Sequence, residues 1–268
     1  MNSIQISIGA NEEQQEILIS QLSDLEADGF EQKDNYLIAY FNENIFKSYE
    51  VNELLKGYIF TTKTINEKNW NEEWESNFQP VVVDNFCAIR AEFHEAIPNV
   101  EHEIIITPKM SFGTGHHATT YMMIQQMKDI DFSNKTVFDF GTGTGILSIL
   151  AEKLGALQIE AIDVDDWSIA NAKENIERNN CTRISLTLSS QILDASYDII
   201  LANISRNVIL NYLSQLGNNL KQNCLLLLSG LLTSDEGDIV EACIKENLRF
   251  VKRIERNKWI SLLFIKAI

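Results

Sequence analysis

The hydrophobic pattern changes its period several times within the first 66 residues. Every second residue is apolar from Ile4 to Ile8, which predicts a half-buried strand. Apolar residues then recur at helical spacing over 12–26, with Asn11 as the N-cap and Gly29 as the residue that stops the helix. Later runs predict two strands around a turn, a second helix and a last strand, at Phe30–Gln32, Tyr36–Phe41, Ser48–Lys56 and Tyr58–Ile65. The order β-α-β-β-α-β predicts a small ferredoxin-like α+β domain over residues 1–66.

Residues 67–80 are polar and carry Trp70 and Trp74 four positions apart, which predicts a linker helix with an aromatic stripe. We expect these tryptophans to pack on a neighbouring domain rather than to bind a ligand. Pro80 ends this segment. The second domain is expected to cover residues 81–268, and it is introduced by three predicted strands at Val81–Val83, Phe86–Ala91 and Glu103–Thr107.

From about Thr119 onward, helical and strand patterns alternate. The predicted helices are Thr119–Lys128, Ile146–Leu154, Trp167–Asn179, Val208–Leu220 and Ser234–Glu246. The predicted strands between them are Thr136–Phe140, Gln158–Asp163, Ser185–Leu188, Ile199–Ala202 and Cys224–Ser229. This alternation predicts a doubly wound, Rossmann-like parallel sheet in an α/β domain. Two final strands, Arg249–Glu255 and Trp259–Ile265, are joined so tightly that they must form an antiparallel hairpin.

Composition narrows the class of protein. The 268 residues carry a formal net charge of −16, which repels nucleic acid phosphates and attracts a basic partner, although the same charge also serves solubility. No apolar run is long enough to span a membrane, and the alternating start of the chain does not resemble a secretory signal. The four scattered cysteines form no CxxC pair, so we expect reduced thiols, neither disulfides nor a zinc site, and a cytoplasmic protein.

The strongest chemical signal is a glycine-rich turn between a predicted strand and a predicted helix. Gly141, Gly143 and Gly145 follow Asp139 in the order GxGxG, in place of the GxGxxG of dinucleotide-binding proteins. Glycines let the backbone approach a ligand closely, and the start of the helix offers free N–H groups. The alternative is a tight turn without a ligand, which the strand–turn–helix context disfavours.

The next predicted strand ends in an acidic residue that could bind the ribose of a nucleoside. Asp163 ends the next predicted strand, 22 residues after Gly141, and its carboxylate can accept hydrogen bonds from both ribose hydroxyls. The alternative role is a helix N-cap, which Asp165 or Asp166 fills better. Together the turn and Asp163 predict an adenosine site, but NAD would also satisfy this pair.

A loop containing Phe112, Gly113 and Thr114 precedes the predicted helix that contains Thr120. Such a loop can cover a bound ligand, so these residues are candidate cofactor contacts. The adjacent His116 and His117 have no third ligand nearby, so we expect a hydrogen-bonding or capping role and no metal.

Asn203 ends the fourth predicted strand, at the edge where α/β sheets bind ligands. Its amide oxygen can accept a hydrogen bond from an amine and orient the lone pair of that amine. An asparagine can equally form a turn that caps the following helix, and the residues alone leave both roles open.

Six blocks together resemble the bacterial ribosomal protein L11 methyltransferases: FGTGHHATT, DFGTGTGIL, AIDVD, LANI, LSGLL and KWISLLFIK. The resemblance covers nearly the whole chain. It implies a class I methyltransferase fold, S-adenosyl-L-methionine as cofactor and contacts to it at Thr120, Gly141, Asp163 and Asn203. It also implies that the first domain recognises ribosomal protein L11, a basic protein substrate.

The resemblance implies methylation of amines of that substrate, either lysine side chains or the N-terminal α-amine. Our hypothesis assigns Asn203 as the catalytic residue that orients the amine, and we expect a monomer. Three alternatives stay open. The first is a methyltransferase of another protein or of a small molecule. A protein glutamine amide is disfavoured as its target, because such enzymes resemble an Asn-Pro-Pro-Tyr signature and here Ile204 and Ser205 follow Asn203. The glycine spacing disfavours an NAD-dependent oxidoreductase, and the intact glycines and Asp163 disfavour a non-catalytic ribosome-associated factor.

Overall fold

The computed structural model describes residues 3–65, 78–109, 113–192 and 194–267. The chain divides between residues 73 and 74 into two compact units, which are described separately. The predicted linker helix, with Trp70 and Trp74, lies outside the described residues except at its last three positions. No helix in the described ranges is long and apolar enough to cross a membrane.

The first unit has one sheet covered by two helices. Its elements are β1 (Ser3–Gly9), α1 (Glu12–Ser23), β2 (Gly29–Lys33), β3 (Tyr36–Asn42), a 3-10 turn at Glu43–Ile45, α2 (Ser48–Leu54) and β4 (Phe60–Ile65). The sheet order is β2-β3-β1-β4, and every neighbouring pair is antiparallel. The alternation at the start of the chain places Ile4, Ile6 and Ile8 in the core of this unit.

Helix α1 begins where the sequence predicts and ends earlier. Asn11 forms a capping box, because its side chain accepts a hydrogen bond from the Gln14 amide and the Gln14 side chain accepts one from the Asn11 amide, both at 3.0 Å. The prediction that Gly29 stops the helix is wrong. Glu26 adopts a φ of 69° and the next amide, that of Ala27, donates back to the Leu22 carbonyl at 3.1 Å, so a left-handed turn ends the helix and Gly29 starts β2.

The second unit is built on a seven-stranded sheet of order β10-β9-β8-β11-β12-β14-β13. Its strands are β8 (Thr136–Phe140), β9 (Gln158–Asp163), β10 (Ile184–Leu188), β11 (Tyr197–Asn203), β12 (Leu220–Leu232), β13 (Leu248–Arg256) and β14 (Trp259–Lys266). Strands β8 to β12 run parallel, whereas β14 pairs antiparallel with both β12 and β13. The predicted α/β sheet with a C-terminal antiparallel hairpin is therefore confirmed.

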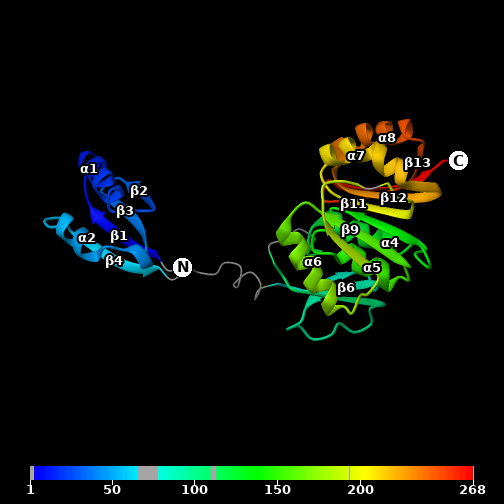
Figure 1. Cartoon of the computed structure of the whole chain (residues 1–268), viewed down its shortest axis with the longest axis horizontal. Coiled ribbons are helices and arrows are strands. Elements are labelled where there is room, and N and C mark those ends of the chain that lie inside the picture. Colours follow the sequence, from blue (N-terminus) through cyan, green and yellow to red (C-terminus); the bar gives the residue numbers. More distant parts are fainter. Residues whose placement is uncertain (1–2, 66–77, 110–112, 193, 268) are drawn as a thin grey trace. The chain divides into compact units, whose positions relative to one another are not determined.

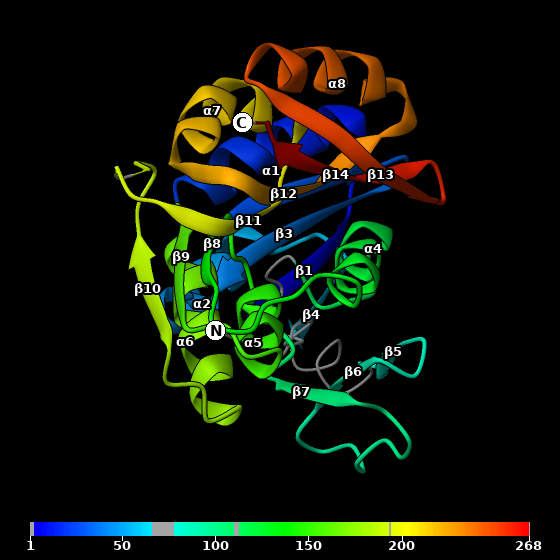
Figure 2. The ribbon, with the colours of Figure 1, turned by 90° about the vertical axis from the view of Figure 1, so that its right-hand side faces the viewer.

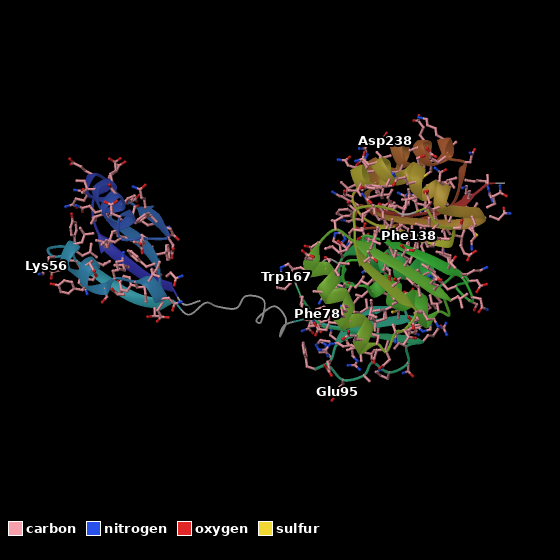
Figure 3. All side chains as sticks on the ribbon, viewed as in Figure 1. Lys56, Phe78, Glu95, Phe138, Trp167 and Asp238 are labelled. Carbon is pink, nitrogen blue, oxygen red and sulfur yellow. The ribbon has the colours of Figure 1, made fainter. Side chains whose placement is uncertain are left out.

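Helices cover both faces of this sheet (Figures 1 and 2). One face carries α4 (Ala118–Met127), α5 (Ile146–Lys153) and α6 (Asp166–Arg178), and the other carries α7 (Arg206–Asn219) and α8 (Glu236–Lys245). Consecutive residues of β8 belong to the hydrophobic clusters on opposite faces of the sheet. Val137 packs with the first group of helices and Phe138 with the second. Phe138 lies inside the unit, whereas Trp167 and Asp238 lie at its surface (Figure 3).

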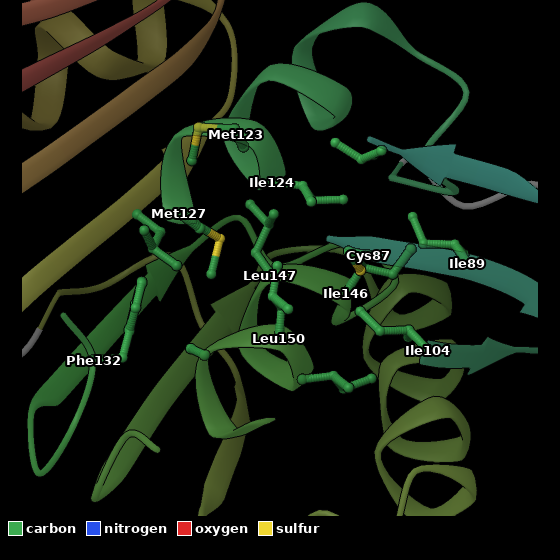
Figure 4. Close-up of a cluster of buried hydrophobic side chains, with 14 of the residues drawn as sticks. Cys87, Ile89, Ile104, Met123, Ile124, Met127, Phe132, Ile146, Leu147 and Leu150 are labelled. Carbon is green, nitrogen blue, oxygen red and sulfur yellow. The ribbon is translucent and has the colours of Figure 1, made fainter. Parts of the chain in front are cut away.

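A three-stranded sheet precedes this domain core, with β5 (Val81–Val83), β6 (Cys87–Ala91) and β7 (His102–Ile106) in that order. Its apolar side chains join those of α4 and α5 in one cluster (Figure 4). Cys87, Ile89 and Ile104 of the small sheet belong to the same cluster as Leu147 and Leu150 of α5. The four cysteines are free thiols, and Cys87 and Cys243 are buried.

Strand β12 is longer than the predicted Cys224–Ser229, since it extends from Leu220 to Leu232. Its pairing with β14 shifts register between Leu228 and Leu231. Gly230 lies inside this irregularity, and the strand continues past it towards the site described below.

Candidate functional site

A cavity of about 480 Å³ opens at the carboxyl ends of the parallel strands. The sheet order reverses direction between β8 and β11, and α/β sheets bind their ligands at such a switch point. The lining comes from the ends of β8, β9 and β11, from the start of α6, and from β12 and β14. The lining residues are His117, Phe140, Gly141, Gly143, Asp163, Val164, Ser168, Ser189, Asn203, Ile204, Ser205, Val208, Gly230 and Trp259.

The glycine turn forms one wall of this cavity. The amides of Gly141 and Thr142 both donate to the Ile162 carbonyl, at 2.9 and 3.0 Å, so the turn is tied to the end of β9. Gly141 has a φ of +77°, and a Cβ atom there would lie 2.4 Å from the Cγ2 atom of Ile204. Only glycine fits at this position, and the exposed backbone is what a ligand meets.

Asp163 lies beside the turn, as the sequence predicts, and lines the cavity. One of its carboxylate oxygens accepts the Gly143 amide at 2.8 Å, and the other accepts the Asp165 amide at 3.1 Å. Asp163 is not the helix cap, because Asp165 caps α6 by accepting the Ser168 amide at 2.9 Å. The carboxylate is therefore held by main-chain donors next to the cavity, and its remaining lone pairs can accept further hydrogen bonds.

Asp139 lies buried beneath the turn. Its Oδ2 atom accepts hydrogen bonds from the Thr142 hydroxyl at 2.7 Å and from the Ser148 hydroxyl at 2.6 Å, and no described residue hydrogen-bonds to its Oδ1 atom. Burial, together with the nearby charge of Asp163, raises the pKa of Asp139 to about 6 despite these hydrogen bonds. Only Asp163 of these two carboxyl groups lines the cavity, and the lining contains no lysine or arginine, which favours a cationic ligand.

Asn203 stands between this cavity and a smaller one of about 10 Å³, and it lines both. The side chain is 7% exposed, and its amide nitrogen donates to the Thr120 hydroxyl at 3.2 Å. Its Oδ1 atom is buried and has no hydrogen-bond partner among the described residues. The residue at the N-cap of α7 is Ser205, so Asn203 does not cap that helix. Its free acceptor therefore remains for a ligand.

The loop before α4 is anchored to the glycine turn. The Gly113 carbonyl accepts a hydrogen bond from the Thr144 hydroxyl at 2.8 Å, and Gly113 lines the smaller cavity together with Thr120. Thr114 instead contacts His116, with 3.4 Å between its hydroxyl and the ring nitrogen Nδ1, and it lines neither cavity. Phe112 lies outside the described residues.

The adjacent histidines have separate roles. His117 is the N-cap of α4, where its ring accepts the Thr119 amide, and its ring meets the edge of Trp259 with 4.7 Å between centroids. His116 packs edge-on against Phe78 at 4.9 Å. Burial lowers the pKa of both rings, so each is more readily neutral than a free histidine. The described parts of the chain contain no cluster of three or more residues that could hold a metal ion.

A family model described as ribosomal protein L11 methyltransferase matches residues 2–267. The chain belongs to this family. Relatives named ribosomal protein L11 methyltransferase are 36% identical over 260 residues in Porphyromonas gingivalis and 34% identical over 266 residues in Phocaeicola vulgatus. The first alignment covers 93% of this chain and 90% of that relative, and the second covers 95% of both.

The crystal structure of ribosomal protein L11 methylase from Lactobacillus delbrueckii subsp. bulgaricus is similar, with a TM-score of 0.66 and 27% sequence identity. The superposition covers 71% of this chain and 99% of that chain. The fold is therefore the α/β methyltransferase fold with a mixed central sheet, and membership of the ribosomal protein L11 methyltransferase family makes the chain a methyltransferase.

In this member of the L11 methyltransferase family, six of the nine predicted site residues line one of the two cavities. Four of them line the larger cavity: Gly141, Gly143, Asp163 and Asn203. The Thr120 hydroxyl accepts a hydrogen bond from the Asn203 amide. Gly145 instead begins α5 and lines neither cavity, so its contact with a cofactor stays a prediction.

Gly230 and Trp259 are among the lining residues that sequence reasoning missed. Gly230 and Trp259 come from β12 and β14, far along the chain from the glycine turn. Both stand in sequence blocks that resemble the family, LSGLL and KWISLLFIK, and a resemblance by blocks was the one signal that pointed to them. Their hydrophobic context alone reads as ordinary strand interior.

Proposed function

We propose that this chain transfers methyl groups from S-adenosyl-L-methionine to amines of ribosomal protein L11, either lysine side chains or the N-terminal α-amine. The observation that carries the proposal is the buried Oδ1 atom of Asn203, an acceptor without a partner among the described residues, in the wall of a cavity at the switch point of the sheet. A neutral amine has the N–H group that this acceptor needs.

The residues present fit this cofactor. The missing Cβ at Gly141 leaves bare backbone at the cavity wall, Asp163 offers acceptors for ribose hydroxyls, and the lining without lysine or arginine suits a cation. Gly141, Gly143, Asp163 and Thr120 would hold it, while Phe112, Gly113 and Thr114 would cover it from the loop before α4. When bound, S-adenosyl-L-methionine supplies a methyl group that is already activated by its positively charged sulfur.

The protein must still align the amine with the methyl group and exclude water from the site. A lysine amine has a reference pKa of about 10.4 and an α-amine about 8, so the amine must lose a proton before it can act as a nucleophile. An apolar cavity that excludes water lowers the pKa of an amine. Asn203 then accepts an N–H hydrogen bond and turns the lone pair of the amine towards the methyl group, which is an orientation effect. Thr120 keeps the Asn203 amide from rotating.

We also propose a role for the first unit, residues 1–66. Its β-α-β-β-α-β order and its sheet order β2-β3-β1-β4 support a ferredoxin-like domain, which would bind the protein substrate. The net charge of −16 supports attraction of a basic ribosomal protein and disfavours direct nucleic acid binding. We propose a monomeric enzyme that acts in the cytoplasm, and the free cysteines agree with a reducing compartment.

The test is Asn203→Ala, assayed with labelled S-adenosyl-L-methionine and purified L11. We expect the rate constant for methyl transfer to fall about 10²-fold, with the dissociation constant of the cofactor changed by less than about threefold. Asn207→Ala is the matched control, because this exposed asparagine lies four residues on, in the first turn of α7. Equal losses of rate and cofactor affinity in Asn203→Ala would show that Asn203 only binds the cofactor.

A further inference from the structure

Two asparagines of helix α6, Asn171 and Asn175, and its C-cap residue Asn179 are spaced four residues apart on one face. Asparagine is a poor residue for a helix interior, because its side chain competes for backbone hydrogen bonds. Asn171 and Asn175 are nevertheless fully buried. Buried amides need hydrogen-bond partners, and the partners of all three lie in other segments of the second unit.

The outermost asparagine supports the neighbouring sheet. Strand β7 is at the edge of its three-stranded sheet, so one side of its backbone has no neighbouring strand. The Asn179 side chain donates to the Ile105 carbonyl at 2.7 Å and accepts from the Ile105 amide at 3.1 Å. One side-chain amide thus takes the place of a strand residue, and it contacts no part of the glycine turn.

Asn175 makes a different pair of contacts. Its Oδ1 atom accepts the Thr107 amide at 2.8 Å, just beyond the end of β7. Its Nδ2 atom donates to the Thr144 carbonyl at 2.8 Å, inside the glycine turn. Asn175 lines neither cavity, so it acts on the site only through the segments that it joins.

The two segments that Asn175 joins both connect to the loop before α4. Thr107 begins the segment that leads to this loop, and Gly113 within it accepts the hydroxyl of Thr144 at 2.8 Å. The start is further fixed because Glu174 accepts the Thr107 hydroxyl and the Lys109 ammonium, both at 2.7 Å. Both ends of the segment 107–113 are therefore anchored, and Thr144 and Asn175 connect the two anchors.

We propose that Asn175 is a positioning residue for the cofactor, because it fixes the Thr144 peptide of the glycine turn and the base of the covering loop in one geometry. This inference rests on the proposed function, since it takes the cavity as the S-adenosyl-L-methionine site. Asn175 touches no reacting atom. Its loss should weaken cofactor binding and leave the chemical step at saturating cofactor nearly unchanged.

The experiment compares Asn175→Leu with Asn179→Leu in the full chain. Leucine has nearly the shape of asparagine without its polar atoms, and each substitution removes three side-chain hydrogen bonds. Binding of S-adenosyl-L-methionine is measured by calorimetry, stability by Tm, and methyl transfer to L11 as separate kcat and KM values. We expect both variants to lose Tm. Asn175→Leu should raise the dissociation constant about tenfold, and Asn179→Leu should change it less than about twofold.

Two results would overturn the proposal. One is a wild-type dissociation constant in Asn175→Leu. The other is an equal rise of the dissociation constant in both variants, which would mean that these asparagines only support the fold. If Asn175→Leu does not fold, Asn175→Asp replaces it, since the carboxylate still accepts the Thr107 amide and loses the donor to Thr144. An unchanged dissociation constant there also overturns the proposal. Absence of cofactor binding in the wild type is a different result, which refutes the proposed function itself.

Discussion

Gly230 provides a test of how the C-terminal part of the sheet shapes the site. It adopts a φ of +86° within β12, and a Cβ atom there would lie 2.1 Å from the carbonyl oxygen and 2.7 Å from the carbonyl carbon of Ile204. Ile204 directly follows Asn203, so relief of this overlap must move the Asn203 backbone. Restoring an ordinary contact requires a shift of about 1 Å, and a misplacement of that size costs about 10²-fold in rate.

Gly230→Ala should therefore reduce methyl transfer to L11 about 10²-fold. Gly155→Ala is the matched control in the same unit, because Gly155 has a φ of +97° and its added Cβ would make only an ordinary 3.5 Å contact with Ser133. Both variants carry the strain of alanine in left-handed backbone, about 1 kcal/mol, and Gly230→Ala carries the overlap with Ile204 in addition, so it should lose more Tm than the control. Initial rates and Tm are measured for each. A wild-type rate of methyl transfer in Gly230→Ala, or an equal loss of rate in both variants, would refute this account of the site.

Two further predictions concern protonation. The pKa of Asp139 is about 6 in the folded protein against 3.8 ordinarily, so its contribution to stability is full below the lower value and is lost as pH rises through the higher one. Asp139→Asn does not titrate, and its Tm relative to wild type should rise between those two pH values; parallel Tm profiles would contradict the assignment. Asn203→Asp places a carboxylate beside the substrate amine, favours the ammonium form and should shift the pH–rate profile to higher pH. A slower enzyme with an unshifted profile would show that Asn203 does not face the amine.

The sequence predicted the repeating strands and helices of the second unit well, because the central strands are buried on both faces and the helices carry apolar residues at helical spacing. Helix ends were less accurate where capping decides them. Helix α6 begins at Asp166 because Asp165 caps it, and α1 ends early because Glu26 takes a left-handed conformation. A polar residue with a positive φ gives no signal in a hydrophobic pattern.

Long-range contacts were the main features that the sequence did not reveal. The position of Gly230 against Ile204 depends on how β12 pairs with β11 and β14, which no local pattern encodes. The asparagines of α6 similarly read as part of a polar helix face, although Asn175 is buried and joins segments about 30 and 70 residues away in the chain. By contrast, the positions of Gly141 and Asp163 at the cavity were predictable because they follow from a strand end and a turn.

The most direct test of the central claim is mass spectrometry of purified L11 after incubation with this protein and S-adenosyl-L-methionine. The account predicts that L11 gains mass in whole methyl increments on amine groups, and that Asn203→Ala, while still binding the cofactor, largely abolishes the gain. Cofactor binding without any gain of mass on L11 would contradict the proposed substrate. An equal gain with Asn203→Ala and with wild type at matched early times would contradict the role of Asn203.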